Sequence, residues 1–462
     1  MGELAVRGTG IPGLLIIDLV VSGDARGWFK ENWQRARMTA LGLPDFGPVQ
    51  NNMSFNTSRG VTRGLHAEPW DKLVSVAHGR VFGAWVDLRP EGLGTVVTAE
   101  LGPETAVFVP RGVANGYQTL TDDTVYSYLV NEHWRPESRA SYSYLNLADE
   151  TAAVAWPIPL ADAVISEADL AHPRLAEARP VPPKKTVIVG AGGQLGRALA
   201  SLLPDAVALG RPDFDVTRQD SVDAVDWAGV GTIINASAFT AVDAAETAEG
   251  RREAWATNVE GVARLCRVAA EHRLTLVQVS SDYVFDGTAS EHDEDEGFAP
   301  LGVYGQTKAA GDALVGQLAR HYVVRTSWVV GDGRNFVATM AGLARRGLSP
   351  TVVADQDGRL TFTADLAAGI VHLLGGAPYG TYNLSNTGPV QSWADIAADV
   401  FELCGRSRVD VVPVTTEQYS AGKLVAPRPA HSALKLDKLL ATGFTPAPAA
   451  DRLREYVAGL PG

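Results

Sequence analysis

Residues 186–196 read Thr-Val-Ile-Val-Gly-Ala-Gly-Gly-Gln-Leu-Gly, an apolar run that passes into a glycine-rich turn and then into a helix-compatible stretch from Gln194 to Leu203. Glycines at such a turn let the backbone approach a pyrophosphate, and the free N–H groups of the following helix attract its charge. The pattern predicts the first strand, turn and helix of a dinucleotide-binding fold. A turn with a purely structural role is the alternative.

Strand and helix patterns alternate beyond this turn. Apolar runs at 206–209, 232–235 and 274–279 predict strands, and residues 259–271 have the periodicity of a helix. Repeated βαβ units indicate an α/β domain of the Rossmann type, with a doubly wound parallel sheet.

The first 150 residues follow a different pattern, in which short runs of β-branched and aromatic residues alternate with Gly, Pro, Asn and Asp; the runs are 73–76, 81–86, 96–99, 106–109 and 125–130. Many short strands without long helices between them predict an all-β sandwich or barrel. Residues 179–185, Arg-Pro-Val-Pro-Pro-Lys-Lys, are typical of a linker. We therefore expect a multidomain protein: one domain at 1–178, a linker at 179–185 and a second domain at 186–462.

Composition limits the classes of function. The chain has 462 residues, of which 46% are hydrophobic, and 40 basic against 53 acidic side chains give a net charge of −13, which argues against nucleic acid as a partner. Cys266 and Cys404 are the only cysteines, so we expect no disulfide framework and no zinc site. No secretory signal or apolar run of about 20 residues is visible, so we expect a cytoplasmic protein without a membrane partner. The acidic stretch 291–296 predicts a solvated loop.

Tyr304 and Lys308 are spaced by four residues, which places them on one face of a helix. An ammonium beside a phenol lowers its pKa, as a proton donor to a reduced carbonyl requires, and Ser281 could hydrogen-bond the same oxygen. Arg211, after the second strand, indicates room for the 2′-phosphate of NADPH. A surface arginine is the alternative, so NADH stays open.

The second half resembles the extended short-chain dehydrogenase/reductases and, within them, the dTDP-4-dehydrorhamnose reductase family. The matching stretches are 190–196, 235–243, 280–287, 304–308, 325–329, 335–336 and 428–429. The resemblance implies a small substrate-binding subdomain and hydride transfer from a nicotinamide to C4 of a 4-keto-6-deoxy nucleotide sugar. It makes Tyr304 the acid, Lys308 its tuner and Ser281 the carbonyl partner, with Trp328 and Arg428 at the substrate. The cofactor-binding residues would be Gly190, Gly193, Gln194, Leu195, Gly196, Arg211, Asp215, Ala236, Ser237, Tyr304 and Lys308.

Two departures concern the substrate side: His431 stands where this family usually has Asn, and Leu360 where a proline is expected. A 4,6-dehydratase of the same superfamily is a rival, because such enzymes carry acidic residues after the catalytic Ser or Thr. Here Asp282 is followed by Tyr283, which weakens that alternative.

The first half carries a different set of reactive side chains. His66 ends one expected strand, Lys72 begins another, and Tyr126 and Tyr128 share one face of a third. A histidine base, a cation for the enolate oxygen and a phenol that reprotonates from the opposite face suit proton transfer next to a ketone. Taken singly, each has an ordinary structural explanation.

The order of motifs from residue 1 to about 178 resembles the dTDP-4-dehydrorhamnose 3,5-epimerase family, which has a cupin-like jelly roll. The motifs are 27–31, 50–54, 60–66, 72–74, 86–89, 110–112, 126–128 and 165–169. The resemblance implies that His66 is the base, oriented by Asp169, and that Tyr128 is the acid, with Lys72 at the enolate. It implies a homodimer formed through this domain, and substrate contacts from Phe29, Glu31, Gln50, Asn52, Arg63 and Asn115.

Asn115 is the clearest difference from the family pattern, because this family and cupins generally show histidine at this position. Without that imidazole a usual metal ligand is missing, so we expect no metal. Asn115 leaves open whether C3 and C5 are both epimerised. Together the halves predict a bifunctional enzyme that makes dTDP-L-rhamnose with NADPH or NADH. The alternatives are a reductase fused to a noncatalytic sugar-nucleotide-binding or dimerisation module, and a reductase that makes another 6-deoxyhexose.

Overall fold

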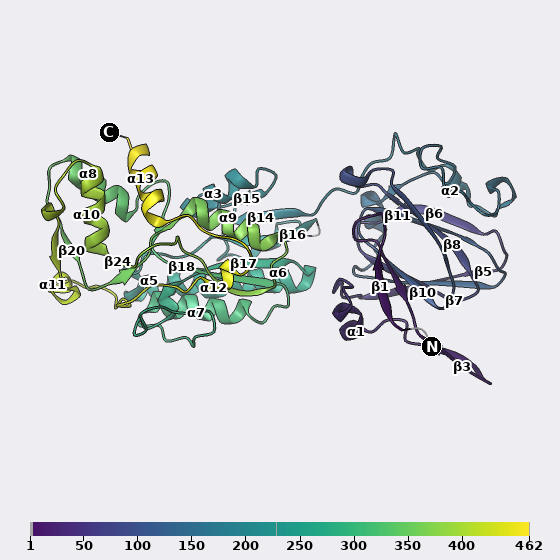
Figure 1. The fold of residues 1–462 in the computed structure, drawn as a ribbon, viewed down its shortest axis with the longest axis horizontal. Helices are drawn as coiled ribbons and strands as arrows, with labels where there is room; N and C mark the ends of the chain where they lie inside the picture. Colours follow the sequence, from purple (N-terminus) through teal and green to yellow (C-terminus); the bar gives the residue numbers. More distant parts are fainter. Residues whose placement is uncertain (1–2, 228, 462) are drawn as a thin grey trace. The chain divides into compact units, whose positions relative to one another are not determined.

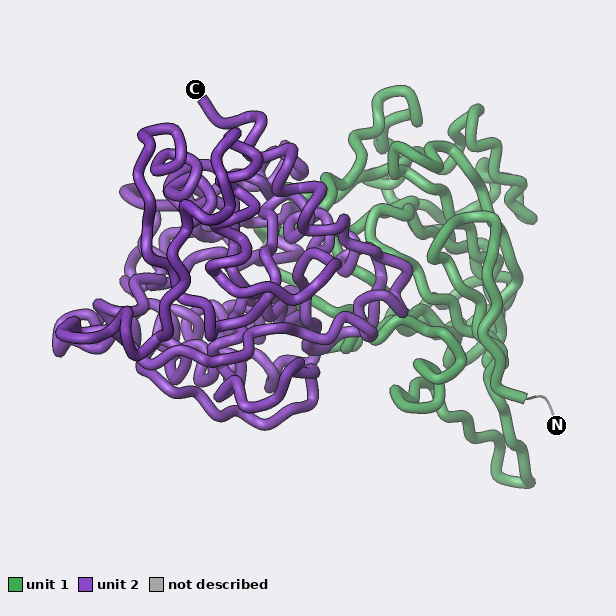
Figure 2. Tube along the Cα trace, turned by 60° about the vertical axis from the view of Figure 1, so that its left-hand side comes forward, with its two compact units in different colours: residues 1–183 green, residues 184–462 purple. Residues whose placement is uncertain are grey.

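The computed structural model describes residues 3–227 and 229–461. The chain divides into two compact units, residues 1–183 and 184–462 (Figure 2). Among the described residues, no helix combines the length and the apolar character that crossing a membrane requires.

The first unit is built from antiparallel strands with two short helices, α1 (Arg35–Ala40) and α2 (Glu167–Leu170) (Figure 1). Its strands are β1 (Ala5–Gly8), β2 (Leu15–Asp18), β3 (Val21–Asp24), β4 (Gly27–Lys30), β5 (Gln50–Asn56), β6 (Thr62–Ala67), β7 (Lys72–His78), β8 (Val81–Asp87), β9 (Val96–Leu101), β10 (Thr105–Val109), β11 (Val113–Thr119), β12 (Thr124–Val130) and β13 (Ser143–Tyr144). All five runs predicted as strands are confirmed.

The strands form one sheet of order β1-β2-β10-β7-β12-β5 and another of order β13-β6-β11-β8-β9. Side chains alternate across a strand, so each sheet turns one apolar row inward. Val74 and Tyr126 from the first sheet pack with Trp85 and Val113 from the second in one buried cluster. The core therefore lies between the two sheets.

Each sheet is also covered on its outer face. Met38 of α1 and Phe46 pack on the first sheet, and Leu145, Leu175 and Val181 pack on the second. Val181 lies within the expected linker, so this part of residues 179–185 packs with the first unit. The β3–β4 hairpin is paired only within itself and projects from the unit (Figure 1).

The second unit has a parallel six-stranded sheet of order β15-β14-β16-β17-β18-β23. Its strands are β14 (Lys185–Val189), β15 (Val207–Leu209), β16 (Val230–Asn235), β17 (Thr275–Ser281), β18 (His321–Thr326), β19 (Val329–Val330), β20 (Thr351–Val353), β21 (Asp357–Gly358), β22 (Thr361–Phe362), β23 (Gly380–Asn383), β24 (Gln391–Ser392) and β25 (Val412–Val414). Its helices are α3 (Gln194–Leu202), α4 (Gln219–Asp223), α5 (Ala248–Trp255), α6 (Val262–His272), α7 (Val303–Val315), α8 (Phe336–Arg345), α9 (Thr363–Leu374), α10 (Trp393–Leu403), α11 (Thr416–Ser420), α12 (Asp437–Leu440) and α13 (Ala449–Gly459).

Helices cover both faces of this sheet. Val187 of β14 packs with α6 on one face, and its neighbour Ile188 packs with α3 and α9 on the other. A strand buried on both faces is continuously apolar, which is why 186–189 contains no polar alternation. The predicted doubly wound parallel sheet is confirmed. A separate core joins α8, α10 and α13 with β20 and β22 at the end of the unit (Figure 1).

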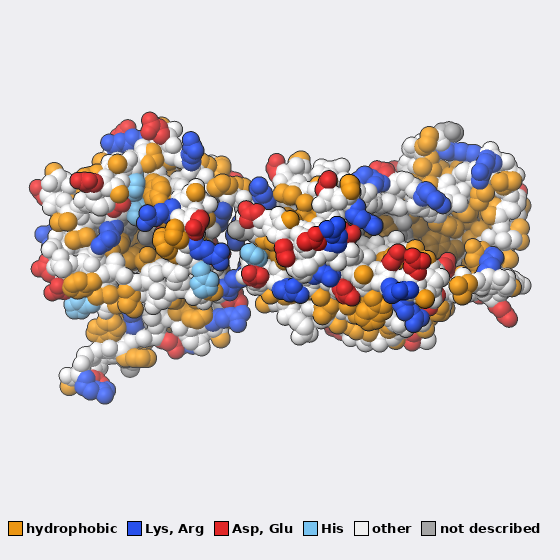
Figure 3. Space-filling view, turned by 180° about the vertical axis from the view of Figure 1, so that it is seen from behind, with side chains coloured by type: hydrophobic (Ala, Val, Ile, Leu, Met, Phe, Trp, Pro, Cys, Tyr) orange, Lys and Arg blue, Asp and Glu red, His pale blue; other side chains and the backbone are white. Residues whose placement is uncertain are grey.

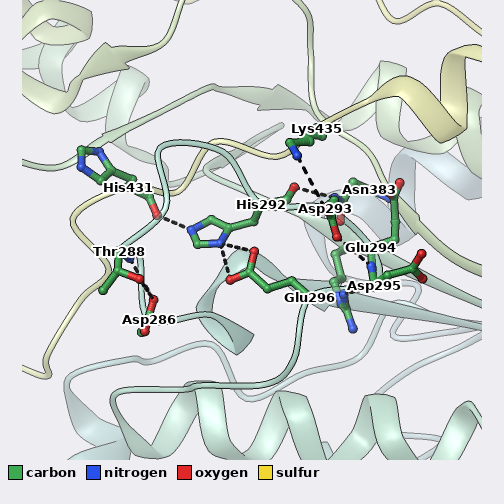
Figure 4. A network of polar contacts seen from close by, with 11 residues as sticks. Asp286, Thr288, His292, Asp293, Glu294, Asp295, Glu296, Asn383, His431 and Lys435 are labelled. Carbon is green, nitrogen blue, oxygen red and sulfur yellow. Dashed lines mark hydrogen bonds and ion pairs between the residues drawn. The ribbon is translucent and has the colours of Figure 1, made fainter.

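The acidic stretch 291–296 is not the simple solvated loop that its charge predicts. His292 has 0% of its side chain exposed and stacks on Phe285 with ring centroids 4.6 Å apart. Its Nδ1 lies 2.9 Å from both Glu296 carboxylate oxygens, and Nε2 lies 3.2 Å from the carbonyl oxygen of His431 (Figure 4). Both ring nitrogens therefore face acceptors, and the buried His292 anchors the acidic stretch to the rest of the unit.

Candidate functional site

The first unit holds a cavity of about 170 Å³ inside its sandwich, lined by Ser54, Arg63, Gly64, His66, Glu68, Lys72, Asn115, Tyr117, Tyr126 and Tyr128. All but Glu68, which lies in the turn between β6 and β7, come from β5, β6, β7, β11 and β12, so strands of both sheets supply them. The expected base, cation and acid, His66, Lys72 and Tyr128, are among them.

Asp169 lies behind His66, outside the cavity lining. Its Oδ1 is 3.0 Å from His66 Nε2, and its Oδ2 accepts a hydrogen bond from the Gly64 N–H at 3.2 Å. Burial raises the pKa of Asp169, but the hydrogen bond and charge of His66 and the Gly64 N–H more than offset this effect and hold the pKa below its usual value. The carboxylate therefore stays ionised and fixes the imidazole, which leaves His66 Nδ1 to accept a proton.

Gly64 makes this arrangement possible. Its φ is +116°, and a Cβ there would lie 2.7 Å from the Cα of Gly116 on the neighbouring strand. Only glycine lets β6 approach β11 this closely while its N–H points at Asp169.

Lys72 is buried, and its Nζ lies 3.0 Å from Oε1 of Glu68, a carboxylate that no sequence motif pointed to. The other oxygen of Glu68 accepts a hydrogen bond from the Trp70 indole at 2.6 Å. Burial, reinforced by the charge of Glu68, raises the pKa of Tyr128 to about 12, so its phenol is protonated at neutral pH and able to act as an acid.

Asn115, at the position where the resemblance led us to expect histidine, connects two other side chains of the sandwich. Its Oδ1 accepts hydrogen bonds from the Trp85 indole at 2.9 Å and from the Tyr126 hydroxyl at 3.2 Å. Asn115 therefore joins the two sheets beside His66, its antiparallel partner across β6 and β11.

Phe29, Glu31, Gln50 and Asn52 are not among the described residues that line this cavity. Phe29 lies on the projecting hairpin, and the Gln50 and Asn52 side chains hydrogen-bond to each other. The structure thus brings Arg63 and Asn115 of the expected substrate set to the cavity, and leaves these four outside it.

His172 is a further neighbour that the sequence did not reveal, three residues after Asp169. Its ring centroid lies 5.3 Å from that of His66 and 4.7 Å from that of Tyr144. Burial, with the charge of His66, lowers the pKa of His172. The ligand atoms of His66, Asp169 and His172 all lie within 4.8 Å of one another, a donor set that could also hold a metal ion.

The glycine turn of the second unit borders a cavity of about 800 Å³. Gly190, Gly193, Arg211, Asp215, Ala236 and Ser237 line it as expected. Gly190 has a φ of +82°, and a Cβ on it would lie 2.6 Å from the Ser237 N atom. Gly196 lies outside the described lining, but a Cβ there would lie 2.2 Å from the Gly190 carbonyl oxygen, so it lets α3 begin against the turn. This backbone cradle fits a dinucleotide pyrophosphate.

Beside this cofactor cavity, the second unit has another cavity of about 620 Å³, and Gly193, Ala236 and Ser237 line both. Gln194 and Leu195 line the cavity of about 620 Å³. Ser281, Tyr304 and Lys308 also line it, so the three expected catalytic residues face one space at the carboxyl ends of the strands. Figure 3 shows a hollow with hydrophobic side chains on this unit.

Contrary to the expectation, Lys308 does not bring the pKa of Tyr304 below its ordinary value. The Lys308 ammonium donates to the Val279 carbonyl oxygen at 2.6 Å, and burial lowers its pKa to about 8. Burial and the charge of Asp282 raise the pKa of Tyr304 well above its ordinary value, although the Ser281 hydroxyl opposes this shift. The expectation of a lowered tyrosine pKa is therefore wrong for this structure, because the loss of solvation dominates.

Trp328 lines the second cavity and stacks on Trp393 with ring centroids 3.7 Å apart, and Leu360 lines it too. Arg428 lies outside the described lining; it pairs with Asp243 at 2.8 Å and hydrogen-bonds Tyr283, which does line the cavity. His431 Nδ1 lies 3.5 Å from Oδ2 of Asp357.

Comparison with known proteins agrees with this division of sites. Residues 8–177 match the family described as dTDP-4-dehydrorhamnose 3,5-epimerase, and residues 184–460 match the RmlD substrate binding domain family. A protein of Streptococcus pyogenes named "Protein RmlC homolog" is 49% identical over 180 residues, which cover 38% of this chain and 90% of that protein.

For the second unit, a dTDP-4-dehydrorhamnose reductase of Aggregatibacter actinomycetemcomitans is 38% identical over 275 residues, covering 55% of this chain and 92% of that protein. A crystal structure of dTDP-4-dehydrorhamnose reductase from Bacillus anthracis in complex with NADP is 34% identical, with a TM-score of 0.56, and covers 60% of this chain and 99% of that chain. Both resemblances found in the sequence are thereby confirmed. The chain belongs to the dTDP-4-dehydrorhamnose 3,5-epimerase family through its first unit and to the RmlD reductase family through its second, and it is both an isomerase and an oxidoreductase.

Proposed function

We propose that the chain carries out two consecutive steps on one nucleotide sugar. The first unit, which we infer to be a cupin-like jelly roll, inverts C3 and C5 of dTDP-4-dehydro-6-deoxy-D-glucose. The second unit, with residues beyond its main sheet forming a small substrate-binding part, reduces the C4 ketone to give dTDP-L-rhamnose. The main support for this proposal is that each unit has a cavity of its own, lined by a candidate acid and by the polar side chains that would act with it.

In the first step, His66 takes the proton from a carbon next to the ketone, and Asp169 stabilises the imidazolium that forms. The electron pair moves to the C4 oxygen, where the Lys72 ammonium stabilises the enolate. Tyr128 returns a proton to the same carbon from the opposite face, and the proton held by His66 restores the tyrosine through solvent. The cycle is neutral in atoms and charge, and its repetition at the other carbon completes the epimerisation.

In the second step, NADPH supplies a hydride to C4 when it is bound. Tyr304 gives its proton to the C4 oxygen, Ser281 donates a hydrogen bond to that oxygen, and the buried Lys308 charge stabilises the tyrosinate left behind. Arg211, on the rim of the cofactor cavity, is placed to meet the 2′-phosphate that distinguishes NADPH from NADH.

We further propose that the first unit forms a homodimer. Phe29 is 73% exposed on the projecting hairpin, and Met53 and Phe55 are 67% and 58% exposed on β5, the edge strand of its sheet. Exposed apolar side chains on an unpaired edge favour association with another copy. Phe29 and Glu31 lie away from the cavity of their own chain, so we assign them to the cavity of the partner chain. Phe55→Glu is expected to yield monomers in analytical ultracentrifugation and to lose epimerisation while reduction persists; dimers with normal epimerisation would contradict this assignment.

A cytoplasmic location follows from the same proposal, since NADPH is a cytosolic reductant and Cys266 and Cys404 are free thiols.

The test of the two-step function uses the full chain, dTDP-4-dehydro-6-deoxy-D-glucose and NADPH in D₂O. We expect NADPH oxidation and dTDP-L-rhamnose that carries deuterium at C3 and C5. Reduction without deuterium at either carbon would support the noncatalytic-module alternative. Deuterium at one carbon only would show that the first unit epimerises a single centre, and a 6-deoxytalose product would identify a reductase for another sugar.

A further inference from the structure

Asp282 is a fully buried carboxyl group beside the reductase centre, and the mechanism above gives it no task. It follows Ser281 at the end of β17, and it lines the same cavity as Ser281 and Tyr304. Asp282 Oδ1 lies 2.7 Å from the Ser281 hydroxyl oxygen. The same hydroxyl oxygen accepts a hydrogen bond from the Tyr283 N–H at 3.2 Å.

The number of protons on Ser281 limits what it can do. A hydroxyl has one hydrogen to donate and two lone pairs to accept. If Asp282 is ionised, its oxygen can only accept, so the 2.7 Å contact consumes the single Ser281 hydrogen. Ser281 then has no hydrogen for the substrate ketone and can only accept from the Tyr304 hydroxyl.

A neutral Asp282 reverses this arrangement. Its acid proton goes to the Ser281 oxygen, where it and the Tyr283 N–H occupy both lone pairs. The Ser281 hydrogen is then free to point at the ketone oxygen, and the Tyr304 hydroxyl, which no longer has Ser281 as an acceptor, turns to the same oxygen. One proton on Asp282 thus sets the direction of both donors.

We propose that Asp282 is a positioning residue that must be in its neutral acid form for Ser281 and Tyr304 to donate to the C4 oxygen. This proposal rests on the reductase function proposed above. It makes ketone reduction by this chain sensitive to the protonation of a group that acts through Ser281 and Tyr304.

The surroundings of Asp282 favour the neutral acid at mildly acidic pH. Burial is the main influence and raises its pKa to about 6, against the opposing effects of the Ser432 and Ser281 hydroxyls and of His292. Two phenols, Tyr304 on α7 and the neighbouring Tyr283, also face it among the described residues, and the Asp282 charge raises the pKa of both. An ionised Asp282 therefore makes Tyr304 a weaker acid, and protonation of Asp282 removes that effect.

The experiment measures kcat/KM for reduction of the pre-epimerised ketone by NADPH, from pH 5 to 9, in the full-length wild type and in two variants. Wild-type kcat/KM is expected to fall as the pH rises through the Asp282 pKa, toward a tenfold loss per pH unit. Asp282→Asn, whose amide can donate to Ser281 at every pH, is expected to lack this fall. Asp282→Ala, which leaves Ser281 unoriented, is expected to be pH-independent from pH 5 to 7 and about a hundredfold slower than wild type at pH 5, near the lower end of the cost of an oxyanion donor.

Asp286→Asn is the matched control, since Asp286 lies on the same loop and its carboxylate accepts from Thr288. It should keep the wild-type profile. Infrared difference spectra across the same pH range give a readout besides activity: a carboxylic acid band present in the wild type and missing in Asp282→Asn. A fall near pH 6 that persists in Asp282→Asn, or the lack of that band in the wild type, would overturn the proposal. A wild type that does not reduce the ketone at any pH would instead refute the proposed function.

Discussion

Asp169→Asn tests the link between the geometry of the first unit and its chemistry. The two Asp169 oxygens have different partners, the Gly64 N–H at Oδ2 and His66 Nε2 at Oδ1. An asparagine has only one acceptor oxygen, and the backbone N–H of Gly64 cannot change its role. The oxygen is therefore expected to stay with Gly64, and the amide NH₂ then faces His66 Nε2.

That NH₂ group donates to Nε2 and so forces the histidine proton onto Nδ1, the nitrogen that has to accept the substrate proton. A charge-assisted hydrogen bond contributes about 1.5–3 kcal/mol, which corresponds to a loss of about 10- to 150-fold. The wrong tautomer adds to this loss; in serine proteases the equivalent change costs about 10⁴-fold. We expect deuterium exchange at C3 and C5 to slow by about 10²- to 10⁴-fold.

The assay follows exchange from D₂O by NMR in the full chain, without NADPH. Reduction of the pre-epimerised ketone by the same preparation shows that the protein is folded and should be unchanged. Glu167→Gln is the control, because this exposed acid belongs to the same short helix, α2. Exchange at the wild-type rate in Asp169→Asn would refute the assigned role of the carboxylate.

Three further outcomes are expected. Tyr304→Phe should lower NADPH-dependent reduction by about 10²- to 10⁴-fold, the usual contribution of an acid catalyst, and leave deuterium exchange intact; loss of both activities in folded protein would contradict one chemistry per unit. Gly196→Ala should raise the KM for NADPH at least tenfold, because its Cβ would lie 2.2 Å from the Gly190 carbonyl oxygen; an unchanged KM would show that the turn yields at no cost. Lys308 is charged below its pKa of about 8 and neutral above it, so reduction by Asp282→Asn should fall only above pH 8; a rate that is flat to pH 10 would remove Lys308 from the mechanism.

Much of the fold could be predicted because the spacing of apolar residues within a strand or helix is a property of a short stretch of sequence. The run at 186–189 is apolar throughout because both faces of β14 are buried, and alternation at 125–130 places Tyr126 and Tyr128 on one face. The strand and helix that begin the second unit differ from their predicted bounds by a residue at most at each end.

The site was harder to predict where a residue's role depends on a partner distant in sequence. Glu68 precedes Lys72 by four residues, but only the fold of the intervening turn makes them a buried pair. The charge run at 291–296 indicated solvent exposure, whereas His292 is buried because Phe285 and the segment at 431–435 cover it. The pKa of Tyr304 could not be inferred from Lys308 alone, since burial is a property of the whole cavity.

The two hydrogen bonds that Asn115 accepts constrain how this position can evolve. An amide oxygen has two lone pairs and satisfies both the Trp85 indole and the Tyr126 hydroxyl, whereas a neutral imidazole offers a single acceptor nitrogen. Asn115→His by itself would leave one of the two donors without an acceptor in the core of the sandwich. Relatives with histidine at this site should therefore also differ at 85 or 126, and Asn115→His should be tolerated here only together with a second replacement at one of those positions.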